Sequence, residues 1–527
     1  MGEKSTRVLL INTPYPLDEH PMPSLSLSYL GAVLQREGVE VEVLNLLTAR
    51  YSANKIKRKL EEYRPHVVGT SCATMSYPTA SRVLKACKRF DPSVVTVIGG
   101  PHVSFTAKET LEHAPWIDIV VCGEGEETLA ALIRALEGGA SLRGVPGIAF
   151  REDGAIVLTE TRPPIEDLDA LPMPARHLLP LSKYRALGAP ASVITSRGCP
   201  YKCIFCSGPR LFGRRVRFRE PKLVVDEIEY IHKELGFDKM NIVDDTFTIN
   251  HRHAREVCQE ILRRGLKFQW NVFARADTVT EDILKIMKEA GCVWLLFGVE
   301  SASPEILKTI KKGTTPDGVR RGVKLSAEAG IKVFNSFIIG LPGESPETAQ
   351  QSLAFAQELD KQYGAKYGFH LLSPLPGTEL YERPEDYGLR ILSRNWAKYD
   401  ANEPITETAT MKPEMALEFI AEYDRAVAYA WDDIKRRAEA GDPECEEEVR
   451  QKASAEFVWR LLKGDVIEGL GRIRANDASH SVEQLTRKVA QKLAVPLDVA
   501  QREMGRLVEQ GFIKSELVNG GYVWKWS

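Results

Sequence analysis

Three cysteines near the middle of the chain have a spacing that could hold a metal cluster. Cys199, Cys203 and Cys206 form the pattern C-x3-C-x2-C. Three thiolates can bind three irons of a four-iron, four-sulfur cluster, and the fourth iron then stays open to another ligand. An open position also distinguishes catalytic metal sites from closed structural ones. The spacing therefore predicts a catalytic [4Fe-4S] cluster.

Two other interpretations of these cysteines compete with the cluster. Positions i, i+4 and i+7 lie on one face of a helix, so the three side chains could be core residues. The flanking residues favour an irregular loop instead, namely Gly198, Pro200, Gly208 and Pro209. A zinc site usually has paired cysteines or histidines, but the next such residues along the chain are His232 and Cys258. The cluster is the favoured interpretation.

The elements around the cysteines alternate between strand and helix patterns over residues 191–400. Six strand-and-helix units follow one another there, whereas a complete eight-unit barrel usually needs about 250 residues. We therefore expect a partial (β/α)6 barrel. Active sites of such barrels lie at the C-terminal ends of the strands. The cysteine loop and the segments VDD, GVES and GLPGE are all expected at those ends.

The cysteine segment resembles the cluster loop of radical S-adenosyl-L-methionine (AdoMet) enzymes, the radical SAM family. The family motif has this spacing with an aromatic residue just before the last cysteine, here Phe205, and the likeness extends through the whole second block. It implies that the open iron binds AdoMet, and that an electron from the cluster cleaves AdoMet to methionine and a 5′-deoxyadenosyl radical. The cofactors carry this chemistry, and the protein supplies position and excludes water.

The same resemblance implies that AdoMet contacts residues at successive strand ends. The expected contacts are Phe205, Asp244, Asp245, Arg275, Glu300, Ser301, Ile339 and Gly340. The chain has VDD where the family more commonly has GGE, so the likeness is weaker at that strand. Considered singly, Asp245 and Ser301 could also start loops or cap helices.

The first 150 residues repeat a shorter pattern of strand, loop and amphipathic helix. Apolar runs of four to seven residues alternate with helical patterns, which predicts a doubly wound, Rossmann-like α/β domain with a parallel sheet covered on both faces. Ligands of such domains bind beyond the C-terminal ends of the strands. The residues expected there include Thr13, Pro14, Tyr15, Ser71, Thr74, Met75, Gly99, Gly100, His102, Gly123, Glu124, Gly125 and Glu126.

Placed before such a barrel, this domain resembles the cobalamin-binding domain of cobalamin-dependent radical SAM enzymes. The likeness rests on NTPYP, GGPH and VCGEGEETL and on their order, and it implies that the residues just named bind cobalamin. Gly99 and Gly100 permit a close approach of the backbone to a bulky group. The helix that begins after Gly123 offers free amides to a polar ligand.

A cobalt-binding histidine is a separate question. Asp18-Glu19-His20 matches the start of the D-x-H-x-x-G signature, but Pro23 stands where the signature has glycine. Members of the resembling family often lack this ligand, so cobalamin does not depend on His20. The alternative for the domain is an α/β module that binds a nucleotide or nothing. A dinucleotide ligand is disfavoured, because no G-x-G-x-x-G follows the first strand.

The rest of the chain divides by composition. Residues 151–190 are proline-rich and predict a linker with a small strand pair, and residues 401–474 look helical. Residues 475–527 show two helices and a hairpin around Asn-Gly-Gly, a winged-helix-like pattern. Seven basic and six acidic residues give this module a net charge of +1, which argues against nucleic acid as a partner. Tyr522, Trp524 and Trp526 share one strand face and are expected to pack inside the protein.

The overall composition is that of an ordinary globular protein. The chain has 527 residues, enough for about three or four domains. Its 70 basic and 72 acidic residues exclude a generally basic, polyanion-coating protein. Nine cysteines are too sparse for a disulfide scaffold, and we find neither a secretory signal nor a membrane-length apolar run. We therefore expect a cytoplasmic protein with reduced cysteines.

These expectations combine into a cobalamin-dependent radical SAM methyltransferase that methylates an unactivated carbon of a small-molecule, lipid-like or natural-product substrate. The family implies an electron donor such as flavodoxin or ferredoxin. Related enzymes use the same cofactors for cyclisation or oxidative rearrangement. A methylthiotransferase would need a second three-cysteine set, but Cys72, Cys87 and Cys122 are widely separated. A regulator that senses iron or cobalamin through a DNA-binding winged helix is the alternative from another class.

The substrate pocket is expected along the barrel strands. The candidate lining residues are Trp270, Phe273, Trp294, Phe334 and His370. Aromatic residues on strands are usually part of the core, however. No catalytic acid or base beyond the cofactors is predicted.

Overall fold

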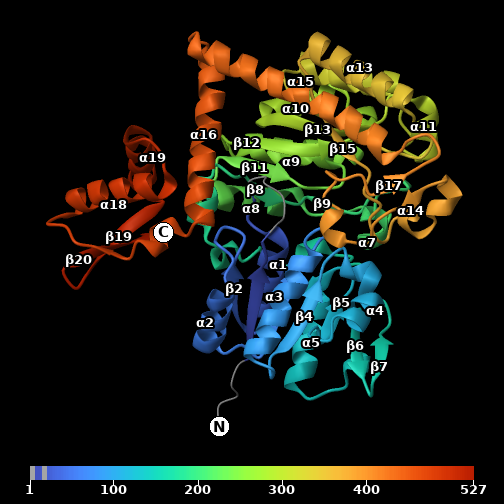
Figure 1. The fold of residues 1–527 in the computed structure, drawn as a ribbon. Coiled ribbons are helices and arrows are strands. Elements are labelled where there is room, and N and C mark those ends of the chain that lie inside the picture. Colours follow the sequence, from blue (N-terminus) through green and yellow to red (C-terminus); the bar gives the residue numbers. More distant parts are fainter. Residues whose placement is uncertain (1–5, 15–20) are drawn as a thin grey trace.

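The computed structural model describes residues 6–14 and 21–527 (Figure 1). Its first part is a seven-stranded sheet with the spatial order β2-β1-β3-β4-β5-β6-β7. The first five strands in this order run parallel, and the last two join antiparallel. The strands are β1 (Arg7–Asn12), β2 (Glu40–Asn45), β3 (Val67–Ser71), β4 (Val95–Gly99), β5 (Ile119–Val121), β6 (Ile148–Glu152) and β7 (Ala155–Leu158).

Strand β1 shows why this sheet is covered on both faces. Its side chains alternate between the faces, and both sets are apolar. Leu9 and Ile11 pack into the core beneath α2, α3 and α4, whereas Val8 and Leu10 pack against α1 and α5. The helices are α1 (Leu25–Arg36), α2 (Ala53–Tyr63), α3 (Tyr77–Phe90), α4 (Val103–His113) and α5 (Gly125–Glu137). The predicted doubly wound domain is confirmed.

The second part is a six-stranded parallel sheet with the order β15-β14-β13-β12-β11-β8. Its strands are β8 (Ala191–Val193), β11 (Lys239–Ile242), β12 (Gln269–Ala274), β13 (Cys292–Glu300), β14 (Lys332–Ile339) and β15 (Lys366–Leu371). The covering helices are α8 (Pro221–Lys233), α9 (His251–Arg263), α10 (Glu281–Glu289), α11 (Pro304–Thr309), α12 (Pro316–Glu328) and α13 (Pro346–Tyr363). This is the partial barrel that the sequence predicted.

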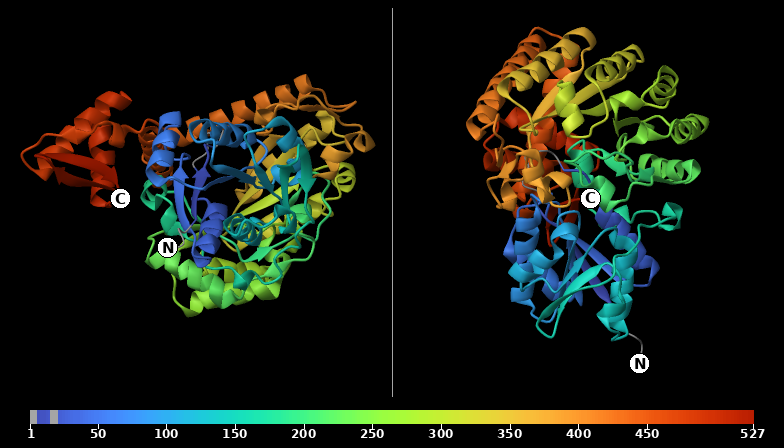
Figure 2. Two further views of the ribbon diagram at one scale, coloured as in Figure 1. Left: turned by 90° about the horizontal axis from the view of Figure 1, so that it is seen from below. Right: turned by 90° about the vertical axis from the view of Figure 1, so that its right-hand side faces the viewer.

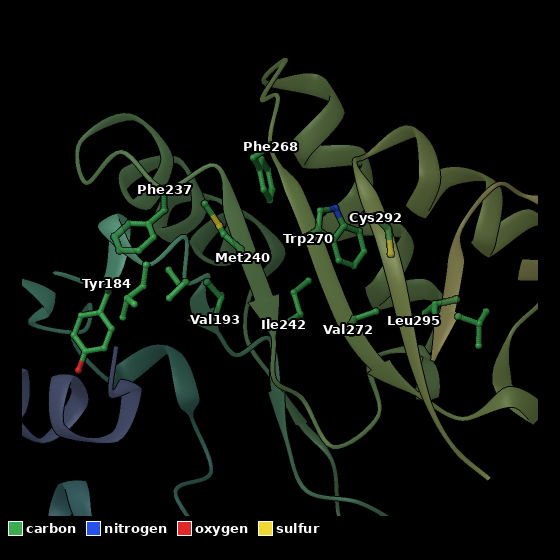
Figure 3. Packing of buried hydrophobic residues seen from close by; sticks show 14 of the residues in the cluster. Tyr184, Val193, Phe237, Met240, Ile242, Phe268, Trp270, Val272, Cys292 and Leu295 are labelled. Carbon is green, nitrogen blue, oxygen red and sulfur yellow. The ribbon is translucent and has the colours of Figure 1, made fainter. Parts of the chain in front are cut away.

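The barrel core lies between the strands and these helices. Figure 3 shows Met240, Ile242, Trp270 and Val272 on neighbouring strands, with Leu295 on β13 beside them. All five side chains are almost completely buried. Alternate residues of the same strands face the barrel interior. The two faces of the barrel strands therefore have different roles.

The segment between the two sheets contains the expected strand pair, but the pair belongs to the first sheet. Strand β6 pairs antiparallel with β5, and β7 pairs with β6, so that sheet extends to Leu158. The short helix α6 (Leu181–Ala186) then leads into β8. Before α6, Leu178 packs closely against Gly31 of α1. A Cβ added at Gly31 would lie 2.6 Å from Leu178 Cδ1.

The C-terminal part consists of two long helices and a small module that projects to one side (Figures 1 and 2). The long helices are α15 (Pro413–Glu439) and α16 (Pro443–Lys463). The module follows α17 (Val466–Gly469) and contains β18 (Arg472–Ile473), α18 (Ala478–Leu493), α19 (Leu497–Glu509), β19 (Ile513–Val518) and β20 (Gly521–Trp526). Its three strands pair antiparallel in the order β18-β20-β19.

Contacts to α6 attach this module to the body. Arg506 Nη2 donates to the Ala186 carbonyl at 3.3 Å, and Ser182 Oγ donates to the Ser527 carbonyl at 2.5 Å. Inside the module, Trp524 is buried and its Nε1 donates to Ser481 Oγ at 2.9 Å. The expected packing of Trp524 is therefore confirmed. In the described part of the chain, no helix is both long and apolar enough to cross a membrane.

Candidate active site between the two sheets

The three cysteines lie on a loop between two short paired strands. These are β9 (Ser196–Arg197) and β10 (Arg217–Phe218), which run antiparallel. The Cys199 amide donates to the Gly213 carbonyl at 3.2 Å and so closes the loop near its base. Gly198 has φ +102°, and a Cβ there would lie 2.5 Å from the Arg215 carbonyl oxygen. The segment is thus the irregular loop that its glycines and prolines predicted, and not one face of a helix.

The three thiols share one electrostatic environment. The charge of Cys206 interacts with those of both Cys199 and Cys203. Burial raises the pKa of Cys203, while the nearby cations of Lys312 and Arg275 oppose this rise. Metal ligation requires thiolates, so these cations favour the binding form.

The donor set fits a cluster better than a single metal ion. Among the described residues, no three His, Cys, Asp or Glu side chains converge on one metal-ion position. In a [4Fe-4S] cluster each thiolate binds a different iron, so such convergence is not required. Three free cysteines on one loop therefore fit the predicted cluster.

Several of the predicted AdoMet contacts surround this loop. Arg275 holds the Asp277 carboxylate through Nε and Nη2, at 3.0 and 2.7 Å, and lies 3.7 Å from the centre of the Tyr201 ring. Asp245 adjoins the last cysteine. A Cβ added at Gly208 would lie 3.2 Å from Asp245 Oδ1 and 3.5 Å from Cys206 Sγ.

Glu300 lies on the same side of the loop, in contact with a residue that the sequence analysis missed. Its carboxylate pairs with Lys312 Nζ at 2.7 Å, and both side chains are buried. Lys312 Nζ also lies 5.9 Å from the centre of the Phe205 ring. Glu300 has φ +69°, a left-handed conformation that is rare for residues other than glycine and is often found at functional sites. Lys312 was missed in the sequence analysis because it belongs to no recognised motif and lies just after the short helix α11.

The other predicted AdoMet residues have local roles in the protein. The Asp244 carboxylate accepts hydrogen bonds from the amides and hydroxyls of Thr195 and Ser196, at 2.5 to 3.1 Å. Ser301 Oγ accepts from the Ser303 amide at 3.2 Å. At the end of β14, the amide of Gly340, which follows Ile339, donates to the Glu344 carboxylate. Contacts from these residues to AdoMet remain predictions.

A cavity of about 300 Å³ lies between the first sheet and the barrel. The first domain contributes predicted cobalamin residues to its wall, namely Ser71, Gly99, Gly100, Gly123, Glu124, Gly125 and Glu126. The barrel side contributes Ile194, Ser196, Arg197, Leu211, Phe212, Val243 and Asp245. One space therefore adjoins both the strand ends of the first sheet and the cysteine loop.

The wall of this cavity combines apolar side chains with glycines. Leu10, Val97 and Leu129 are among its apolar residues, and several glycines of the first domain also line it. Gly100 has φ +105°, and a Cβ there would lie 2.4 Å from the Cys72 carbonyl oxygen. Only glycine allows this close approach of two strand ends. The residues present fit the predicted cobalamin.

His102 and Thr74 are not among the residues that line the cavity. His102 Nδ1 and Thr74 Oγ1 are 3.3 Å apart, and both side chains are buried. The rings of Tyr77 and Trp396 lie 4.6 and 4.8 Å from the histidine ring. Burial lowers the pKa of His102 to about 4, so this histidine is neutral at pH 7.

The remaining predicted cobalamin residues are not placed at the cavity. Among the described residues, Thr13, Pro14 and Met75 do not line it. Tyr15 lies outside the described residues, as does His20, which matches only part of the cobalt-ligand signature. The cobalamin contacts of Thr13, Pro14, Tyr15 and Met75 stay predictions.

Strand alternation separates the aromatic candidates for the substrate pocket. Trp270 is 1% exposed, and its Nε1 donates to the Ala290 carbonyl at 2.8 Å on the helix side of the sheet. Trp270 is therefore a core residue, which is the alternative that the sequence analysis left open for these aromatic side chains. Phe273, three positions further along β12, is 44% exposed and faces the barrel interior. Trp294 and Phe334 are partly exposed on the same face of β13 and β14, and His370 is exposed on β15.

Comparisons with known proteins agree with this division. The family model of the B12 binding domain matches residues 17–133, and that of the radical SAM superfamily matches residues 193–356. A protein of Pyrococcus horikoshii named as an uncharacterised methyltransferase is 38% identical over 384 residues, or 73% of this chain and 83% of that protein. The chain belongs to the cobalamin-dependent radical SAM enzymes. The predicted family and the three cofactors, a [4Fe-4S] cluster, AdoMet and cobalamin, are confirmed.

Two further comparisons show the range of this cobalamin-dependent radical SAM family. The methyltransferase TsrM of Kitasatospora setae, solved with cobalamin and a [4Fe-4S] cluster, is 25% identical with a TM-score of 0.63. The match covers 78% of this chain and 84% of that one. The anaerobic magnesium-protoporphyrin IX monomethyl ester cyclase of Rubrivivax gelatinosus is 31% identical over 402 residues, or 74% of this chain and 70% of that protein.

Proposed function

We propose that this radical SAM enzyme transfers a methyl group to an unactivated carbon of a small-molecule substrate. The observation that carries the proposal is the shared cavity, whose wall includes Gly99 and Gly100 from the first sheet and Asp245 beside the cysteine loop. This arrangement would let the two cofactors act on one substrate. The name of the Pyrococcus horikoshii relative supports methyl transfer over other chemistry.

The protein would hold the cofactors with separate groups of residues. Cys199, Cys203 and Cys206 would hold the cluster, and the first-domain residues that line the cavity would hold cobalamin. When bound, the cluster and AdoMet supply a 5′-deoxyadenosyl radical that abstracts hydrogen, and cobalamin carries the methyl group. The Arg275–Asp277 and Lys312–Glu300 ion pairs would fix the walls around AdoMet.

The substrate would lie inside the barrel, against side chains that the core leaves exposed. Phe273, Trp294 and Phe334 offer apolar surface there. Aromatic walls of this kind bury a substrate and keep water from a reactive intermediate. We propose a flavodoxin or ferredoxin as the electron donor, because reductive cleavage of AdoMet requires one.

Product analysis tests the proposal without a known substrate. Anaerobically reconstituted protein would be incubated with cobalamin, AdoMet and a reductant, and both AdoMet-derived products would be quantified. Methyl transfer to cobalamin predicts S-adenosylhomocysteine in amounts that depend on added cobalamin, together with 5′-deoxyadenosine. Omission of cobalamin is the control. S-adenosylhomocysteine that forms equally well without cobalamin would refute the proposal.

Cyclisation or oxidative rearrangement is the second candidate, supported by the likeness to the Rubrivivax gelatinosus cyclase. These reactions consume the deoxyadenosyl radical but leave the methyl group of AdoMet in place. They predict 5′-deoxyadenosine without S-adenosylhomocysteine. The same incubation therefore separates the two candidates.

A further inference from the structure

We propose that Glu124 of the cobalamin-binding domain is a positioning residue for the iron–sulfur loop. The sequence predicts instead that Glu124 contacts cobalamin. The structure places its carboxylate against two arginines at the base of the cysteine loop. This inference rests on the proposed function, because it requires that the protein bind both the cluster and cobalamin.

The two arginines hold the ends of the loop. Arg197 on β9 and Arg217 on β10 are direct partners in the register of the paired strands. The chain leaves this pair at Arg197, passes through all three cysteines and returns at Arg217. Only Gly198 separates Arg197 from Cys199. A group that fixes both arginines therefore fixes the base of the loop that carries the cluster ligands.

Glu124 reaches both arginines at once. Arg217 donates to the two carboxylate oxygens from Nη1 and Nη2, each at 2.9 Å, and Arg197 Nη1 donates to Oε1 at 3.2 Å. The Ile165 amide, in the linker between the sheets, adds a fourth bond to Oε2 at 2.6 Å. Four donors fill the roughly four acceptor positions of the carboxylate, although Glu124 also lines the cavity. Glu126 supports the same base, since Arg197 Nη2 donates to it at 2.6 Å.

The burial of this network makes the link strong. The Glu124 side chain is 3% exposed, that of Arg217 is 4% exposed and that of Arg197 is 9% exposed. Buried, bidentate bonds between arginine and carboxylate are short and directional. Removal of the carboxylate would take away the counter-charge of buried Arg217 and leave Arg197 paired with Glu126, so the loop base would have to move to hydrate Arg217.

Groups behind a metal ligand set its orientation and typically change metal affinity about 10-fold to 100-fold when removed. The cysteine loop is closed by backbone contacts just beyond the arginines, from the Cys199 amide to Gly213 and from Gly198 to Arg215. A shift at the base therefore reaches the thiols. The cobalamin domain would in this way control how firmly the cluster is held.

The test compares full-length Glu124→Gln with Glu127→Gln, both reconstituted anaerobically with iron, sulfide and cobalamin. Gln keeps the shape of the side chain but turns an N–H donor toward Arg217. Glu127 is the matched control on α5. Its side chain is half-exposed, and its carboxylate makes a longer ion pair, 3.5 Å, with Arg162 Nη1. Three quantities are measured in each: the rate of iron loss to a chelator, the electron paramagnetic resonance spectrum of the reduced cluster, and cobalamin retained after desalting.

For Glu124→Gln we expect roughly 10-fold faster iron loss and an altered cluster spectrum, with cobalamin retained as in the unmodified protein. Glu127→Gln should match the unmodified protein in all three. Loss of cobalamin with normal iron retention and an unchanged spectrum would overturn the proposal and support a cobalamin contact. So would a Glu124→Gln protein indistinguishable from the control.

If Glu124→Gln does not fold, Arg217→Lys tests the same link, because lysine keeps the positive charge but cannot make the bidentate pair with Glu124. It should show faster iron loss, by a smaller factor, with cobalamin retained. Normal iron retention in Arg217→Lys would then overturn the proposal. An unmodified protein that takes up no iron or no cobalamin would count against the proposed function, which keeps the two failures distinct.

Discussion

Three glycine-to-alanine substitutions separate the roles of the glycines in the first domain. Gly100 has φ +105°, and its added Cβ would lie 2.4 Å from the Cys72 carbonyl oxygen and 2.7 Å from the Cys72 amide nitrogen. Gly139 has φ +60° and Gly123 has φ +74°, and at both an added Cβ would meet nothing within 4 Å. Gly123 lines the cavity. Gly139 thus tests backbone strain alone, Gly100 tests strain with a steric clash, and Gly123 tests strain with a change in the cavity.

The expected costs differ by position. Alanine at Gly139 introduces only left-handed strain, about 1–2 kcal/mol. Alanine at Gly100 adds a clash with backbone that cannot rotate away, and overpacking of this kind costs about 1–3 kcal/mol more. Alanine at Gly123 should cost as much stability as at Gly139 but should also weaken cobalamin binding, because Gly123 lines the cavity.

Urea unfolding of the cobalamin-free protein and equilibrium cobalamin titration measure the two effects. The reasoning predicts the stability order Gly139→Ala equal to Gly123→Ala and both above Gly100→Ala. It also predicts weaker cobalamin binding for Gly123→Ala than for Gly139→Ala. Equal stabilities for Gly100→Ala and Gly139→Ala would refute the clash. Equal cobalamin affinities for Gly123→Ala and Gly139→Ala would refute the assignment of the cavity.

Two further predictions concern buried charge. Burial lowers the pKa values of His102 and His253 to about 4, so the unfolded chain takes up protons below pH 6.5 that the native protein does not. As the pH is lowered from 6.5 to 4, the free energy of unfolding should therefore fall by about 1.4 kcal/mol per pH unit for each histidine. His102→Gln should reduce the slope of the urea-derived free energy of unfolding against pH. An unchanged slope would contradict this. Glu227 is fully buried between Arg176 and Arg219. Glu227→Gln should cost about 3–5 kcal/mol by chemical denaturation, against about 0–1 kcal/mol for Glu229→Gln at a partly exposed position of the same helix, and similar losses in both would contradict the burial argument.

The order of strands and helices could be predicted because strands buried on both faces are continuous apolar runs. The inward face of a barrel strand is marked by a different pattern. Trp270 and Phe273 are both aromatic residues of β12, but one is core and the other faces the interior. Trp270 shares its face with the apolar Val272 and Ala274, whereas Phe273 shares its face with Gln269 and Asn271. The alternation along β12 therefore separates the two residues, although both were named as pocket candidates in the sequence analysis.

Long-range pairing explains the other differences. The strand pair after residue 147 and the strand β5 were both visible in the sequence, but their antiparallel pairing was not, so β6 and β7 were assigned to the linker rather than to the first sheet. The position of Glu124 at a helix start suggested ligand binding. Its partners Arg197 and Arg217 follow 73 and 93 residues later. Without a motif that joins them, the ion pairs between the domains could not be predicted.

The most direct test of the central claim is the electron paramagnetic resonance spectrum of the reduced, cobalamin-loaded protein before and after addition of AdoMet. An iron left open by Cys199, Cys203 and Cys206 predicts a [4Fe-4S] signal that changes when AdoMet binds, and both the signal and 5′-deoxyadenosine formation should disappear when the three cysteines are replaced by alanine. A signal that AdoMet leaves unchanged, or that survives the triple replacement, would contradict the account.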